Sequence, residues 1–221
     1  MRLDDAVGSA RTTGWSVVLP VKQLARAKSR LGGALTPGVD ELALAFFQDT
    51  ASAALACGLV DEVLVATSDD RVAAWALARG CRVVSDDGHP GINAAAAEAA
   101  RARSASMVAV MVSDLPCATP EAITAFLSRA AGHPLSFLAD AAGTGTTTWA
   151  STGDDDTPHF GVGSRAAHTK AGAADLIAGL GSDPPLDPLR RDVDTEADLA
   201  DAIRLGVGRH TEQALARNAP A

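Results

Sequence analysis

The chain has 221 residues and a formal net charge of −8, and 47% of its residues are hydrophobic. An acidic chain of this kind does not suit a nucleic-acid partner, and no apolar run is long enough to cross a membrane. Length and apolar content instead predict one globular domain with a sizeable core. Three widely spaced cysteines without a CxxC pair, and an N-terminus without an apolar signal-peptide core, predict a cytoplasmic protein without disulfides or a zinc site.

The first strand and the basic segment after it are the first features with a functional meaning. Residues 1–13 are predicted to be a disordered leader, and residues 15–20 a short apolar strand. Four basic residues follow within nine positions, among them Lys22, Lys28 and Arg30. Phosphate-binding loops follow the first strand of many α/β sheets, so this segment is a candidate for binding nucleotide phosphates. The alternative is a solvated helix face, and the Walker pattern of a P-loop is absent.

Strands and helices then alternate along the chain. Apolar runs bounded by turn residues predict the strands, and periodic apolar patterns predict the helices. Asn93 is expected to cap an Ala-rich helix. This order is typical of βαβ units and a largely parallel sheet. The predicted helices are 40–56, 70–79, 93–104 and 119–132, and the predicted strands are 62–67, 82–85, 107–112 and 135–139.

The central predicted strand has six apolar residues in a row, from Met107 to Val112, which is typical of a strand buried on both faces. It ends at Ser113-Asp114, and Pro116 forbids its continuation because proline lacks the N–H donor. Open α/β sheets bind ligands at the carboxyl ends of their strands. Asp114 is therefore a candidate to hold a metal ion against nucleotide phosphates, and the alternative is an ordinary turn or capping aspartate.

The second half contains two turns rich in glycine and small hydroxyl residues. Residues 140–149 begin as a Gly/Thr turn and continue as a strand. The N–H groups of this turn can bind an anion, and the alternative is an ordinary turn leading into a hairpin. Residues 159–165 form the second turn and lead into a helix predicted from His168 to about Ala178. The consecutive carboxylates at 154–156 point in different directions, so they predict a solvated loop and not a metal cluster.

Near the C-terminus, Asp192 and Asp194 share one face if their segment is extended, so both could face a metal ion. Asp194 is assigned mainly to capping the last helix, 196–205, with Thr195 as the other capping candidate. Residues 209–221 are predicted to be a frayed tail, which leaves 14–208 as a single domain. The five histidines share no metal-ligand spacing, and His168 in particular is assigned a structural role.

Together these motifs resemble the 2-phospho-L-lactate guanylyltransferase family, and within it the actinobacterial phosphoenolpyruvate guanylyltransferases of coenzyme F-420 biosynthesis. The resemblance spans about residues 15–208 and rests on the order and spacing of the motifs. The chain departs from the family pattern at Ser29, at Ser113 and at Val162-Gly163, and the last departure bears on substrate choice. The motifs are Pro20-Val-Lys-x5-Lys28-Ser-Arg-Leu31, Asn93, Ser113-Asp-Leu-Pro116, Ala139-Asp-x2-Gly-Thr-Gly-Thr146, Phe160-Gly-x2-Ser164, Asp192-Val-Asp-Thr195 and Leu205-Gly-Val-Gly208.

The resemblance implies an α/β fold, the Rossmann-like nucleotidyltransferase fold of GT-A type, with a mainly parallel central sheet flanked by helices. It implies transfer of GMP from GTP to the phosphate of phosphoenolpyruvate or 2-phospho-L-lactate, with release of pyrophosphate and a need for Mg²⁺. Asp114 and Asp192 would hold the metal, and Thr146, Gly161 and Ser164 would bind the acid. The nucleotide is assigned to Lys22, Lys28, Arg30 and Asn93, and Lys28 joins the two aspartates as a catalytic candidate.

Two alternatives stay open. A related nucleotidyltransferase could use another nucleotide or acceptor, such as CTP, a sugar phosphate or 3-phospho-D-glycerate. A non-catalytic nucleotide-binding protein would bind GTP without releasing pyrophosphate. The presence of both candidate metal carboxylates and of the basic segment favours an enzyme. A homodimer is left open.

Overall fold

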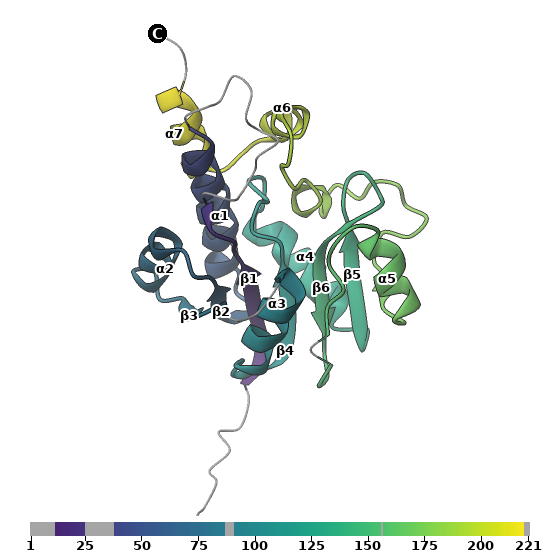
Figure 1. The fold of residues 1–221 in the computed structure, drawn as a ribbon. Helices are drawn as coiled ribbons and strands as arrows, with labels where there is room; N and C mark the ends of the chain where they lie inside the picture. Colours follow the sequence, from purple (N-terminus) through teal and green to yellow (C-terminus); the bar gives the residue numbers. More distant parts are fainter. Residues whose placement is uncertain (1–11, 25–37, 87–90, 156, 219–221) are drawn as a thin grey trace, which may run out of the picture.

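The computed structural model describes residues 12–24, 38–86, 91–155 and 157–218, and its centre is a seven-stranded sheet (Figure 1). The strand order is β3-β2-β1-β4-β6-β5-β7, and only β6 runs antiparallel to its neighbours within the described chain. The predicted α/β fold with a mainly parallel sheet is therefore confirmed. The strands are β1 (Thr12–Pro20), β2 (Val60–Ala66), β3 (Arg82–Val84), β4 (Ala105–Met111), β5 (Leu135–Ala139), β6 (Thr146–Ser151) and β7 (Ala174–Asp175).

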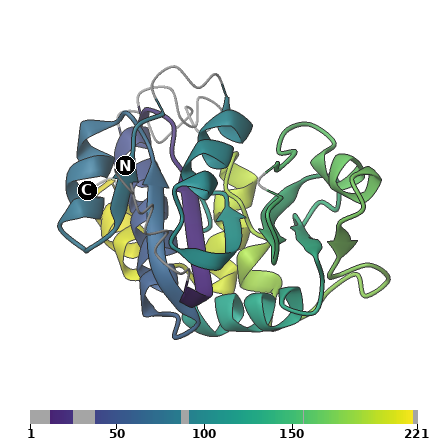
Figure 2. The same cartoon turned by 90° about the horizontal axis from the view of Figure 1, so that it is seen from below.

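Helices cover both faces of the sheet, with α3 on one face and α4 on the other (Figure 2). Helix α1 packs against α4 and β2, and α7 packs against α1 at the upper left of Figure 1. No helix in the described part of the chain is both long and apolar enough to cross a membrane. The helices are α1 (Val39–Ala56), α2 (Asp70–Leu77), α3 (Ile92–Arg101), α4 (Pro120–Ala130), α5 (Ser164–Lys170), α6 (Glu196–Leu205) and α7 (Arg209–Asn218), and a short 3₁₀ helix, η3, covers Asp187–Leu189.

Strand β4 is the buried centre of the sheet, as predicted. It lies between β1 and β6, and residues 108–111 have no exposed surface. The facing residues 17–19 of β1 are equally buried, so apolar side chains fill both sides of this strand pair. Asp114 follows β4 by three residues and is thereby held at the middle of one sheet edge.

The carboxyl ends of β1 to β5 and the first residue of β6 lie together at that edge. Strands β1 to β5 run in one direction, so their carboxyl ends lie together. Strand β6 runs the opposite way, and its first residue, Thr146, therefore pairs with Ala139 at the end of β5. The N–H of Val112 donates to the carbonyl of Thr147 at 2.8 Å, which brings the end of β4 beside the start of β6. Ligand sites of open α/β sheets form at this edge.

Polar side chains cap the starts of α2 and α4, close to the predicted boundaries. Asp69 accepts hydrogen bonds from the N–H groups of Arg71 and Val72 at the start of α2. Thr119 accepts from the N–H of Ala122, with a proline in the first turn of α4. These side chains satisfy N–H groups that have no partner inside a helix, which is why the boundaries could be placed from sequence.

Two predicted helices begin and end elsewhere because glycine sets their boundaries. Helix α3 begins at Ile92 after Gly91, whose φ of 92° lies outside the helical region, so Asn93 sits in the first turn and is not the cap. Helix α5 covers Ser164–Lys170 and not 168–178, and the backbone turns away at Gly172, where φ is 86°. Such positive φ values favour glycine and cannot be located from apolar periodicity.

The predicted frayed tail was wrong, because the chain forms helix α7 there. Buried Asp49 of α1 accepts hydrogen bonds from the N–H groups of His210 at 3.0 Å and Thr211 at 2.9 Å. The backbone of Gly208 passes so close that an added Cβ would lie 2.4 Å from the Asp49 carboxyl carbon. At the other end, β1 begins at Thr12, inside the predicted leader, and residues 1–11 lie outside the described residues.

Candidate active site

A cleft of about 1020 Å³ lies along the sheet edge where the six strand ends meet. This volume accommodates a nucleotide beside a small acid. Its lining comes from the segments after β1 to β5, from the start of β6 and from the turn before α5. The cleft brings together six of the predicted site residues, which are Lys22, Asp114, Thr146, Gly161, Ser164 and Asp192.

Asp114 lies in a loop that is anchored to helix α1. Buried Thr50 of α1 accepts a hydrogen bond from the N–H of Leu115 at 3.1 Å. Leu115 itself is fully buried, so the loop is anchored on one side of the aspartate by both packing and hydrogen bonding. Sequence reasoning missed Thr50, since a threonine inside a helix carries no local signal of a contact with a distant loop.

A backbone hydrogen bond joins the segment that carries Asp192 to the segment that carries Asp114. The N–H of Val193 donates to the carbonyl of Asp114 at 3.2 Å, which joins two segments far apart in sequence. The Val193 side chain is fully buried, while Asp192 and Asp194 on either side of it both line the cleft. This alternation is the extended geometry that the sequence suggested.

The assignment of Asp194 to helix capping was wrong. Thr195 caps α6 by accepting from the N–H of Asp198, and the Asp198 carboxylate accepts from the N–H of Thr195 in return. This reciprocal pair is a capping box and satisfies the first turn of the helix. Asp194 lines the cleft, where its exposed side chain adds a further negative charge.

The neighbouring carboxylates of the cleft perturb Asp192. Burial, followed by the charges of three neighbouring aspartates, raises the pKa of Asp192 to about 7. The neighbours are Asp114, Asp194 and Asp140 in decreasing order of effect. Asp140 was not predicted as a site residue, although it directly follows β5 and its carboxylate oxygens accept from the N–H groups of Thr144 at 2.9 Å and Gly145 at 2.8 Å.

This donor set fits a divalent cation of the Mg²⁺ type. The cleft supplies hard carboxylate oxygens and a negative potential that a cation would relieve. Among the described residues, no group of three or more His, Cys, Asp or Glu side chains is arranged to hold a metal ion alone. Mg²⁺ is commonly bound by one or two carboxylates together with water and substrate phosphates, so Asp114 and Asp192 match the protein's share of such a site.

The structure describes only some of the residues that are predicted to bind the nucleotide. Lys22 follows β1 and lines the cleft with an exposed side chain, whereas Lys28 and Arg30 lie outside the described residues. Asn93 is not among the lining residues. Its amide nitrogen donates to the carbonyl of Phe160 at 2.9 Å and its amide oxygen accepts from the N–H of Phe160 at 2.7 Å. Asn93 therefore holds the turn that carries Gly161.

Two glycine-containing turns form part of the wall of the cleft. In the first, Gly145 lies so close to Asp140 that an added Cβ would meet the carboxylate oxygen at 2.4 Å. In the second, Gly161 has φ of 130° and Gly163 has φ of 71°, backbone conformations that favour glycine. These turns place the Ser164 residue, which is 2% exposed, at the cleft wall.

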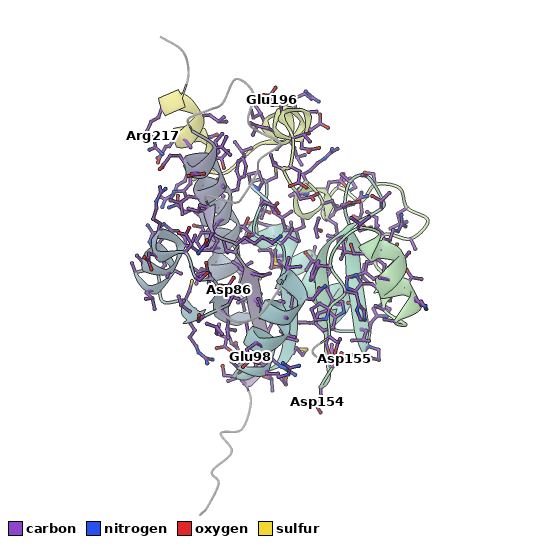
Figure 3. All side chains as sticks on the ribbon, in the orientation of Figure 1. Asp86, Glu98, Asp154, Asp155, Glu196 and Arg217 are labelled. Atoms are coloured by element: carbon purple, nitrogen blue, oxygen red, sulfur yellow. The ribbon has the colours of Figure 1, made fainter. Side chains whose placement is uncertain are left out.

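The consecutive carboxylates lie at the other end of β6. Asp154 and Asp155 follow the last residue of that strand, and both are exposed at the bottom of the molecule in Figure 3. The prediction of a solvated loop is confirmed for these two residues, and residue 156 lies outside the described chain.

His168 is fully buried behind the cleft wall. Burial, followed by the charge of His159, lowers its pKa from 6.5 to about 4. Between these values the unfolded chain binds a proton that the folded chain does not, so the free energy of unfolding falls as pH falls from about 6.5 to about 4. The loss is at most about 1.4 kcal/mol per pH unit.

His168→Gln should therefore flatten the pH dependence of stability in this window. Urea unfolding at about pH 7 and about pH 5 measures it, with exposed His133→Gln as a matched control. An equal loss of stability on acidification in wild type and His168→Gln would show that the buried ring is not the source.

The family follows from similarity to known proteins. Residues 15–218 match the family described as guanylyl transferase CofC like. The chain belongs to this family. A phosphoenolpyruvate guanylyltransferase from Thermomonospora curvata is 48% identical over 213 residues, covering 94% of this chain and 90% of that protein. The phosphoenolpyruvate guanylyltransferase of Streptomyces coelicolor is 44% identical over 209 residues, covering 92% and 96%. The predicted family is thus confirmed.

Solved structures of lower identity share the fold. A Desulfovibrio desulfuricans protein assigned to the nucleotide-diphospho-sugar transferases superposes with a TM-score of 0.62 at 17% identity, covering 94% of this chain and 96% of that one. A nucleotidyl transferase from Methanothermobacter gives a TM-score of 0.55 at 18% identity, covering 87% and 97%. Both confirm the predicted nucleotidyltransferase fold of this CofC-like chain.

Proposed function

We propose that this CofC-like protein transfers GMP from GTP to the phosphate of phosphoenolpyruvate, releasing pyrophosphate, in the biosynthesis of coenzyme F-420. One observation carries the proposal: Asp114 and Asp192, joined by the backbone bond of Val193, line one cleft together with Lys22, Thr146 and Ser164. Residues suited to a nucleotide phosphate, a cation and a small acid thereby share one cleft. The names of the Thermomonospora curvata and Streptomyces coelicolor relatives support the choice of reaction.

The chemistry requires positioning more than proton transfer. A phosphate oxygen of the acid forms a bond to the α-phosphorus of GTP, and the bond from that phosphorus to the oxygen bridging to the β-phosphate breaks. Pyrophosphate departs with the electron pair. The acid phosphate is largely ionised near pH 7, so no side chain needs to accept a proton. The residues of the cleft therefore act by orienting two anions and offsetting their repulsion.

Each part of the cleft has a role in this reaction. Lys22 lies beside the triphosphate, and the sequence adds Lys28 and Arg30 of the following segment. Asp114 and Asp192 would hold Mg²⁺, which would supply positive charge to offset that of the phosphates. The acid lies against Thr146, Gly161 and Ser164, and Asn93 keeps the Gly161 turn in place by its two bonds to Phe160.

A pyrophosphate-release assay with GTP and Mg²⁺ tests the proposal. Phosphoenolpyruvate, 2-phospho-L-lactate, 3-phospho-D-glycerate and a sugar phosphate are supplied in turn, CTP replaces GTP in a parallel set, and mass spectrometry identifies the product. We expect pyrophosphate and a GMP adduct with GTP and phosphoenolpyruvate, and no turnover in excess chelator. GTP binding without pyrophosphate release would indicate a non-catalytic nucleotide-binding protein. Faster turnover with CTP, a sugar phosphate or 3-phospho-D-glycerate would indicate a different transferase.

A further inference from the structure

The hydrogen bonds around His168 determine which ring nitrogen carries the hydrogen. The backbone N–H of His159 points at Nε2 of His168 at 2.9 Å, so Nε2 accepts and bears no hydrogen. A neutral imidazole must then carry its hydrogen on Nδ1. Nδ1 lies 3.1 Å from the hydroxyl oxygen of Thr146, which therefore receives a hydrogen bond from the ring.

Packing fixes the orientation of the His168 ring. It is fully buried and stacks on Phe137, with centroids 5.4 Å apart and an interplanar angle of 27°. Phe160 packs its edge against the same ring at 5.5 Å and 78°. The lowered pKa, about 4, keeps the ring neutral near pH 7. Packing thus sets the orientation of the ring, and the His159 N–H sets its tautomer.

This arrangement controls the direction of the threonine hydroxyl. Because Thr146 Oγ accepts from His168, its own hydrogen must point away from the ring. Thr146 is the first residue of β6 and lines the cleft. Among the described residues, the hydrogen bond of this hydroxyl is the one to His168. The hydroxyl hydrogen is therefore available to an acceptor in the cleft.

We propose that His168 is a positioning residue for the acid: by donating from Nδ1 to Thr146, it makes the threonine hydroxyl a hydrogen-bond donor directed at an anionic oxygen of the phosphorylated acid. This inference rests on the proposed function for the identity of the acid. The same ring also accepts from His159 in the second turn, so it ties the Gly161–Ser164 wall to the start of β6. One buried side chain thereby sets both sides of the acid pocket.

A double-mutant cycle separates positioning from packing. Thr146→Val removes the hydroxyl with little change in shape. His168→Gln can still accept from the His159 N–H but places no donor at Nδ1, whereas His168→Asn can place an amide N–H near Nδ1. We expect Thr146→Val and His168→Gln each to raise KM for phosphoenolpyruvate about tenfold or more, with KM for GTP changed little. His168→Asn should recover most of the loss.

In the combined His168→Gln/Thr146→Val variant, KM for phosphoenolpyruvate should match that of Thr146→Val within about twofold, because the ring acts through the hydroxyl. Additive losses, or equal losses for GTP and phosphoenolpyruvate, would overturn the inference. If the variants do not fold, ¹H–¹⁵N spectra of histidine-labelled wild type decide: hydrogen on Nδ1 supports the inference, and hydrogen on Nε2 or on both nitrogens overturns it. Absence of wild-type turnover would instead refute the proposed function.

Discussion

Asp192→Asn is expected to lower kcat/KM for GTP by at least about a hundredfold while the protein stays folded. A metal ion that neutralises phosphate charge contributes several kcal/mol to the transition state, and each 1.36 kcal/mol is a factor of about ten. Asparagine keeps the shape of the side chain but removes the anionic ligand. Because Asp192 lies among other carboxylates, removing its charge should also leave the melting temperature in chelator unchanged or higher.

Two matched variants make this result specific. Asp154→Asn applies the same chemical change at an exposed position beyond the far end of β6, and full activity is expected there. Asp194→Asn should lose less activity than Asp192→Asn, because the Asp194 side chain is exposed and water screens its charge. Steady-state rates across a Mg²⁺ titration measure all three. An inactive Asp194→Asn beside an active Asp192→Asn would reverse the assignment of the metal ligand.

Asp49→Ala is expected to cost about 3 kcal/mol or more in the free energy of unfolding. The carboxylate accepts from two N–H groups at the start of α7, and hydrogen bonds to charged groups contribute about 1.5–3 kcal/mol each. In a chain of this size the melting temperature should fall by about 6–12 °C. Asp49→Asn retains an acceptor and should lose less.

Exposed Asp40→Ala, on the same helix, serves as the control for removing an aspartate from α1. Surface changes of this kind alter stability by about 0.5 kcal/mol or less. Calorimetric melts of the three variants decide the matter. If Asp49→Ala melts within about 2 °C of Asp40→Ala, the carboxylate does not hold α7 against α1.

Local signals in the sequence were sufficient where one residue and its near neighbours determine the structure. The apolar run of β4 predicted a buried central strand, and the capping side chains Asp69 and Thr119 stand at the predicted starts of two helices. The position of Asp114 after that strand predicted its place at the ligand-binding edge. In each case the determining interactions span only a few residues, so they can be read from composition and spacing.

The remaining features depend on contacts between distant segments. The bond from Val193 to the Asp114 carbonyl brings the two metal candidates together, and only the family resemblance anticipated their pairing. The docking of α7 depends on Asp49, which lies 161 residues before His210. The capping role predicted for Asn93 was wrong for the same reason, since its side chain bonds to the backbone of Phe160 in another element.

The most direct test of the account follows oxygen atoms through the reaction. The protein is supplied with GTP, Mg²⁺ and phosphoenolpyruvate labelled with ¹⁸O in its phosphate, and the product is examined by ³¹P NMR. Direct attack by the acid phosphate predicts a diphosphate joining GMP to the acid, with ¹⁸O in the bridge and one pyrophosphate released per product. Pyrophosphate release without this diphosphate, or an unlabelled bridge, would contradict the account.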